Sequence, residues 1–106
     1  MQYKTADKLL AVNTEYLKPE EFDVSQNYPN PFNPTTTIQY KIPKRSIVKV
    51  EVYDALGRVV DAISEGTKDP GKYQTTFNLN NKASGMYVYK VTAGEYTAVK
   101  RMILMK

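Results

Sequence analysis

The side chains that most often carry out chemistry are scarce in this sequence. Its 106 residues include no histidine and no cysteine, which excludes Ser-His-Asp triads, histidine general bases, thiolate nucleophiles and nearly all zinc sites. The carboxylates that could instead bind calcium are Asp54, Asp61, Glu65 and Asp69. Calcium loops place such groups at alternating positions around a glycine, and that spacing is missing here. We therefore expect no metal and no cofactor.

An enzyme built on carboxylates alone is also not expected. A glycosidase needs two carboxyl groups about 5–9.5 Å apart in a cleft. The few acidic residues of this sequence lie in predicted turns, and a small domain of this kind offers no deep cleft. The sequence therefore predicts a protein that is not an enzyme.

Tyrosines are the second group with a chemical use, because flat aromatic rings can stack on sugars. The candidates for such a carbohydrate platform are Tyr28, Tyr40, Tyr53, Tyr73, Tyr87, Tyr89 and Tyr96. Four of them, Tyr40, Tyr73, Tyr87 and Tyr89, fall on predicted inward faces and are expected to pack in a core. Tyr53 has the opposite phase to the neighbouring valines and is the best exposed candidate. Carbohydrate binding is therefore an alternative function.

Strands with two-residue alternation must position these side chains. Residues 35–42 place Ile38, Tyr40 and Ile42 on one face and polar side chains on the other. The other predicted strands are residues 22–26, 48–53, 58–63, 72–79, 87–93 and 96–105. The predicted turns are residues 43–46, 54–57, with Gly57 at positive φ, 66–71, 80–85 and 94–95. This pattern predicts an all-β fold, an Ig-like antiparallel β-sandwich of six to seven short strands.

Three prolines lie close together ahead of the first long strand. Each proline locks φ and lacks an N–H, and each pushes the residue before it out of the helical region. We therefore expect residues 28–34, here called the proline segment, to form neither a helix nor a central strand. Tyr28 and Phe32 are expected to plug the edge of a core.

The chain divides into two parts. Residues 1–21 are interpreted as a linker or the tail of an upstream domain, with a short helix near Thr5, and residues 22–106 as the sandwich. No signal peptide is recognisable at Met1, so an exported protein would carry this chain as a piece of a longer one. The charge is −2 over residues 1–34 and +6 over residues 35–106. The basic residues are scattered singly, which favours a solvated surface over a nucleic-acid site.

The last predicted strand has apolar residues on both faces near its end. Such a strand is either central or an edge that can pair with a partner, so self-association through this strand is an open hypothesis. Its basic residues offer the alternative explanation that they prevent unwanted pairing.

Four segments, in the same order, resemble the C-terminal sorting domains of the type IX secretion system, type A. They are residues 27–38, with the proline segment, and residues 50–60, 83–91 and 100–106. Parts of the pattern are shared with the Ig-like module of flagellar hook-capping proteins. The turn Lys44-Arg45-Ser46 departs from the family, in which a glycine is common there.

The resemblance implies a secretion signal. A cargo protein would carry the domain at its C-terminus, cross the inner membrane by a separate signal, and leave the periplasm through the type IX outer-membrane translocon. A sortase-type protease at the cell surface would cleave the preceding linker, and the cargo would be released or attached to lipopolysaccharide. We place the cleavage zone at residues 18–26, with Lys18, Glu20, Phe22, Ser25 and Gln26 as candidate positions. The implied sorting-motif residues are Tyr28, Pro29, Asn30, Pro31, Phe32, Asn33, Pro34, Tyr53, Asp54, Gly57, Arg58, Gly85, Tyr87, Lys100 and Lys106.

Overall fold

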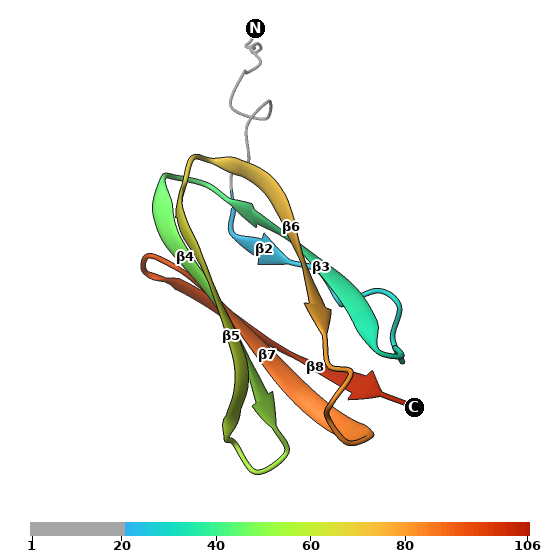
Figure 1. Ribbon diagram of the computed structural model, residues 1–106. Helices are drawn as coiled ribbons and strands as arrows, with labels where there is room; N and C mark the ends of the chain where they lie inside the picture. Colours follow the sequence, from blue (N-terminus) through green and yellow to red (C-terminus); the bar gives the residue numbers. More distant parts are fainter. Residues whose placement is uncertain (1–20) are drawn as a thin grey trace, which may run out of the picture.

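The computed structural model describes residues 21–106, which form two packed antiparallel sheets (Figure 1). The three-stranded sheet has the order β2 (Asp23–Val24), β3 (Thr35–Ile42) and β6 (Gly71–Asn78). The four-stranded sheet has the order β5 (Val59–Lys68), β4 (Ser46–Asp54), β7 (Gly85–Ala93) and β8 (Tyr96–Leu104). Residues 21–106 form no helix, so this part of the chain has none that could span a membrane. The predicted all-β class and strand number are confirmed.

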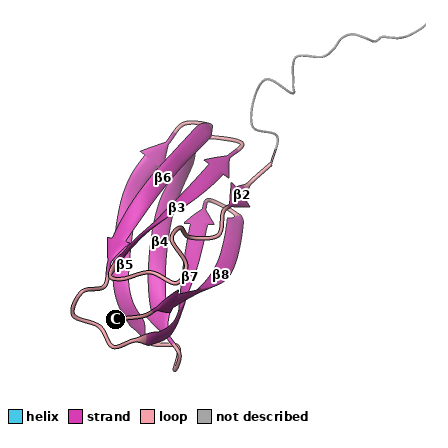
Figure 2. Ribbon diagram, turned by 90° about the vertical axis from the view of Figure 1, so that its right-hand side faces the viewer, coloured by secondary structure: helices cyan, strands magenta, loops and turns pink. Residues whose placement is uncertain are grey.

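The order of the strands identifies the type of sandwich. The chain passes from one sheet to the other between β3 and β4, between β5 and β6, and between β6 and β7 (Figure 2). With the strands lettered A, B, C, C′, E, F and G along the chain, the sheets are A-B-E and C′-C-F-G. Placing strands C, F and G together in one sheet is typical of Ig-like sandwiches.

Apolar side chains from both inner faces form the core. Ile38, Tyr40 and Ile42 of β3 face Val50 and the other inward residues of the four-stranded sheet. The three β3 side chains and Val50 are at most 1 % exposed. The alternation predicted for β3 matches its burial pattern residue by residue. Removal of this apolar surface from water is the main force that holds the two sheets together.

One predicted turn is wrong. Residues 66–71 were expected to form a turn, but β5 continues to Lys68, and the turn is confined to the residues between β5 and β6. The pairing shifts between Val48↔Gly66 and Lys49↔Ser64, which leaves Glu65 as the extra residue of a bulge. Gly66 has φ of +77°, a conformation that suits a bulge as well as a turn.

Two tyrosine hydroxyls hold loops onto the ends of strands. Tyr87 donates to Ala83 O at 2.6 Å, and Tyr73 donates to Asp69 O at 2.7 Å. Each bond reaches four residues back along the chain. Tyr87 lies at the start of strand F, which is where Ig-like domains place their tyrosine corner.

The predicted helix near Thr5 and nearly all of the predicted upstream segment lie outside the described residues. The predicted short strand at residues 22–26 is present as β2, which pairs with the end of β3.

Candidate functional site

Residues 26–34, here called the crossing segment, run from the three-stranded sheet to the outer edge of β8. Phe32 forms a parallel bridge with Leu104. Its N–H donates to Ile103 O at 2.9 Å, and its carbonyl accepts from Met105 N–H at 2.9 Å. The ring of Phe32 is buried in the core. Phe32 therefore fixes the proline segment both to the backbone of the last strand and to the core. The predicted insertion of Phe32 into the core is confirmed, and its pairing with the last strand was not predicted.

Two side-chain amides extend this cover along the edge of β8. Gln26 Nε2 donates to Arg101 O at 2.7 Å, and Asn30 Oδ1 accepts from Ile103 N–H at 3.0 Å. Prolines lack an N–H, so the proline segment cannot form a full strand ladder. The amides pair with backbone groups that would otherwise stay open. The edge of β8 is thus covered by the chain itself from Arg101 to Met105.

The other end of the crossing segment is fixed to the three-stranded sheet by buried polar groups. Asn27 Nδ2 donates to Thr36 Oγ1 at 2.9 Å and to Pro29 O at 3.0 Å, and Thr36 Oγ1 donates to Pro29 O at 2.8 Å. Tyr28 and Thr37 exchange two backbone hydrogen bonds of 2.8 and 3.0 Å. The cis peptide bonds are Tyr28-Pro29, Asn30-Pro31 and Asn33-Pro34.

Two buried phenols join the layers. Tyr89 of β7 donates to Ser25 O at 2.7 Å, just ahead of the crossing segment, and burial raises the pKa of Tyr89 to about 12. Tyr40 of β3 donates to Glu65 Oε1 at 2.8 Å, and burial together with this hydrogen bond raises the pKa of Tyr40 above its ordinary value. Both hydroxyls therefore keep their protons at neutral pH and act as donors between parts of the fold.

Asp54 and Gly57 build the turn between β4 and β5. Gly57 N–H donates to Asp54 O at 2.9 Å, and Gly57 has φ of +86°. Asp54 Oδ1 accepts from Leu56 N–H at 2.9 Å and Arg58 N–H at 3.0 Å, and Oδ2 accepts from Arg58 Nε at 2.8 Å. These donors hold the pKa of Asp54 below its ordinary value. The turn predicted from these residues is confirmed.

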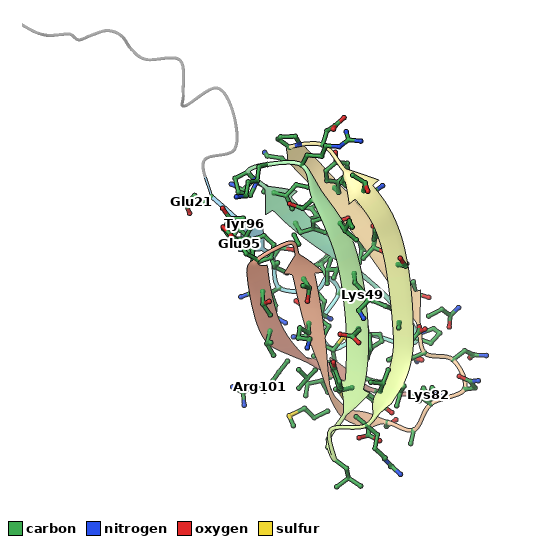
Figure 3. All side chains as sticks on the ribbon, turned by 90° about the vertical axis from the view of Figure 1, so that its left-hand side faces the viewer. Glu21, Lys49, Lys82, Glu95, Tyr96 and Arg101 are labelled. Carbon is green, nitrogen blue, oxygen red and sulfur yellow. The ribbon has the colours of Figure 1, made fainter. Side chains whose placement is uncertain are left out.

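The four segments singled out in the sequence meet on one side of the sandwich. In the sheet register Tyr53 lies beside Val88, and Val88 lies beside Arg101. This row joins the β4, β7 and β8 segments on the outer face, and the crossing segment covers the adjoining edge. Figure 3 shows Arg101 at this edge of the sheet, away from Lys49 on β4.

A family profile described as a secretion system C-terminal sorting domain matches residues 26–105. The match runs from the crossing segment to the end of β8. The chain belongs to this family. It is the family of type IX sorting domains, and it is a non-catalytic family whose members are exported across the outer membrane. The family interpretation is therefore confirmed. None of the curated proteins matches the chain.

The sorting domain places its predicted motif residues in different environments. Tyr28 was expected to plug the core, but its ring is 80 % exposed. Its backbone pairs with Thr37, and the buried position beside it is taken by Asn27. Lys106 donates through its ammonium to Asn80 O, which ties the end of the chain to the loop before β7. Lys100 is half-buried on the inward-facing side of β8.

The candidate calcium ligands of the sorting domain each interact with a different partner. Asp69 pairs with Arg45, Glu65 accepts from Tyr40, and Asp61 accepts from the N–H of the next residue. Within residues 21–106 no three acidic side chains gather at one point.

Two pairs of aromatic rings in the sorting domain stack on each other. Tyr40 stacks on Tyr73 with 5.7 Å between ring centroids, and Phe22 stacks on Tyr96 at 5.5 Å. Tyr53, the residue chosen for a sugar platform, is only half-exposed, and Lys90 Nζ lies 5.7 Å from its ring centroid. The described residues thus show no flat aromatic surface around Tyr53.

The predicted cleavage zone overlaps the folded sorting domain. Lys18 and Glu20 lie outside the described residues. Phe22 packs against the core. Ser25 N–H donates to Gln39 O at 2.8 Å, and Gln39 N–H donates to Ser25 Oγ at 3.0 Å. Ser25 and Gln26 are therefore paired parts of the sandwich.

Some residues that shape this surface were not singled out for it. Gln26 was considered only for cleavage, and the buried pair of Asn27 and Thr36 was not identified. The available signal was the phase of Thr36, which alternates with Ile38 and Tyr40 and so had to face inward. A polar residue in an inward position requires a buried partner.

Proposed function

We propose that this sorting domain directs a larger cargo protein, carried in the same chain, through the type IX outer-membrane machinery. We also propose that it acts as a folded recognition surface with no catalytic activity. The observation that carries the proposal is the meeting of the four family segments on one edge and outer face. These segments are far apart in sequence and lie together only in the folded domain. A partner that contacts all of them therefore recognises the folded domain.

The proposed cleavage by a sortase-type protease falls ahead of Asp23. Proteases cut exposed and unpaired backbone most readily, whereas the backbone from Asp23 onward pairs with β3. Cleavage is therefore proposed at residues 18–22 within the zone, and not at Ser25 or Gln26. In this proposal the cargo passes from the periplasm to the cell surface and is then released or attached to lipopolysaccharide.

The test is export of a fluorescent protein that carries an inner-membrane signal peptide at its N-terminus and residues 1–106 at its C-terminus. In a cell with a type IX system, we expect the fluorescent protein to reach the surface or the medium. In a strain without the outer-membrane translocon, it should stay in the periplasm. Retention in the periplasm of both strains would contradict the proposal and leave a passive structural module.

Deletion of residues 100–106 is a poor probe of recognition. It would remove Met102 and Leu104, which are fully buried, so export would fail because the domain unfolds. Substitutions of exposed residues separate recognition from folding.

A further inference from the structure

The crossing segment and β8 enclose a groove at the edge of the four-stranded sheet. The groove has a volume of about 450 Å³ and is lined by Gln26, Asn30, Met86, Lys100, Arg101 and Ile103. Three of the four family segments contribute to it. Met86 is 39 % and Ile103 37 % exposed, and they are cross-strand neighbours on the outer face. The groove therefore offers an apolar wall beside two cations.

The two cations of the groove differ from the basic residues of the two central strands, β4 and β7. Lys49 and Lys90 both pair with Glu51, and Arg58 pairs with Asp54. Lys100 and Arg101 pair with no carboxylate among residues 21–106. Their charge is free to attract an acidic group from outside the described part of the chain.

Among residues 21–106, the backbone of β8 just before Arg101 O has no partner on its outer edge. Arg101 O points to the outer edge, where Gln26 binds it. Because neighbouring residues of a strand point their backbone groups in opposite directions, Thr97 and Val99 also face this edge, together with Arg101 N–H. The crossing segment covers β8 only from Arg101 O onward. An exposed edge of this kind accepts an added strand.

We propose that this edge binds an extended segment of the export machinery that carries an acidic side chain next to an apolar one. The segment pairs with β8 at residues 97–101, its carboxylate contacts Arg101, and its apolar side chain packs on Met86 and Ile103. Lys100 adds positive charge from the inward-facing side of β8. This inference rests on the proposed function and names the partner's chemistry.

A protein segment fits this edge better than a lipid headgroup. Attachment to anionic lipid by charge uses clusters of about four to eight basic residues, and the groove has two. A lipid also leaves the backbone groups of Thr97 and Val99 without matched partners, whereas an extended peptide supplies both N–H and C=O groups at the spacing of a strand.

The test uses the export assay with full-length 1–106 fusions. Arg101→Glu should lower export about tenfold or more, because it places a carboxylate beside the carboxylate of the partner segment. Arg101→Lys keeps the positive charge and should retain most of the export. Val99→Pro should also lower export, because proline removes the outward N–H yet is tolerated on edge strands. Lys72→Glu, an exposed residue of β6 in the other sheet, is the matched control and should be exported normally. Circular dichroism and urea unfolding must show that each variant is folded.

Several results would overturn the inference. If folded Arg101→Glu is exported like the unsubstituted fusion, the cation has no role. If folded Val99→Pro is exported normally, strand pairing is wrong. If the purified chain binds phosphatidylglycerol vesicles and Arg101→Glu abolishes this binding, the groove binds lipid and not a protein segment. If the chain dimerises in analytical ultracentrifugation and Arg101→Glu abolishes the dimer, the edge of β8 binds a second copy of the chain. Periplasmic retention of the unsubstituted fusion would instead overturn the proposed function, and this inference with it.

Discussion

Three buried polar side chains, Asn27, Thr36 and Tyr89, determine where the crossing segment lies. Asn27 and Thr36 bind each other and both donate to Pro29 O within the proline segment. Tyr89 donates to Ser25 O, just ahead of the crossing segment. A buried polar group without a partner costs free energy, so these residues disfavour other placements of the segment. Prolines alone make the segment stiff, but they carry no information on where it docks.

At the residue scale, the stability of the fold should fall as pH rises from 10 to 12. The pKa of Tyr89 is raised from 10.0 to about 12, so in this window the unfolded chain loses a proton that the folded chain keeps. This group lowers the free energy of unfolding by up to about 1.4 kcal/mol per pH unit. Tyr89→Phe has no such proton, so its urea-unfolding free energy should fall less steeply over the same window.

Tyr28→Phe is the control for this experiment, because the Tyr28 ring is exposed and meets water in the folded and unfolded chains alike. Equal slopes for Tyr89→Phe and Tyr28→Phe would show that the Tyr89 phenol does not couple to folding.

At the scale of the elements, the β4–β5 hairpin depends on a turn that its own residues encode. Asp54 accepts two backbone N–H groups of the turn, and Gly57 supplies the positive φ. These interactions span at most four residues, which is why the turn could be predicted from sequence. The β3–β4 connection, with Lys44-Arg45-Ser46, instead links two sheets, and Ser46 already belongs to β4.

For this hairpin, we expect Asp54→Ala to lower the urea-unfolding midpoint and Asp54→Asn to lower it much less. The asparagine keeps an oxygen for the two backbone N–H groups, although it loses the charge that pairs with Arg58. Exposed ion pairs contribute little, so the backbone bonds should dominate. If both variants shift the midpoint equally, the ion pair matters more than the turn bonds.

At the scale of the whole molecule, the crossing segment closes the sandwich. It pairs with β3 of one sheet through Tyr28 and with β8 of the other through Phe32. The last strand, interpreted from sequence as central or open, is an edge strand that the chain itself covers over part of its length. Self-association through β8 therefore has only the uncovered part of the edge available.

We expect Phe32→Ala to destabilise the domain by about 3–5 kcal/mol, because it empties a fully buried aromatic site. Phe22→Ala, in a partly buried stack on Tyr96, should cost clearly less. Urea unfolding followed by circular dichroism measures both changes. If Phe32→Ala lowers the free energy of unfolding no more than Phe22→Ala does, the buried Phe32 ring is not what holds the crossing segment between the two sheets.

Local sequence patterns were sufficient to predict the strands, most of the turns and the inward faces. Alternation along a strand is a local property, and β3 was predicted with its observed bounds and faces. Local signals were misleading where the same residue is compatible with two structures. A glycine such as Gly66 is compatible with a bulge as well as with a turn, and a tyrosine such as Tyr28 can be exposed as well as buried.

Which segments meet at the proposed recognition surface depends on how the two sheets pack. The bond between Gln26 and Arg101 joins residues 75 apart, and that between Asn30 and Ile103 joins residues 73 apart. No local pattern encodes such pairs, because they form only once both sheets have packed and brought the first residues of the fold to its last strand. The groove, with two cations that pair with no carboxylate of residues 21–106, exists for the same reason.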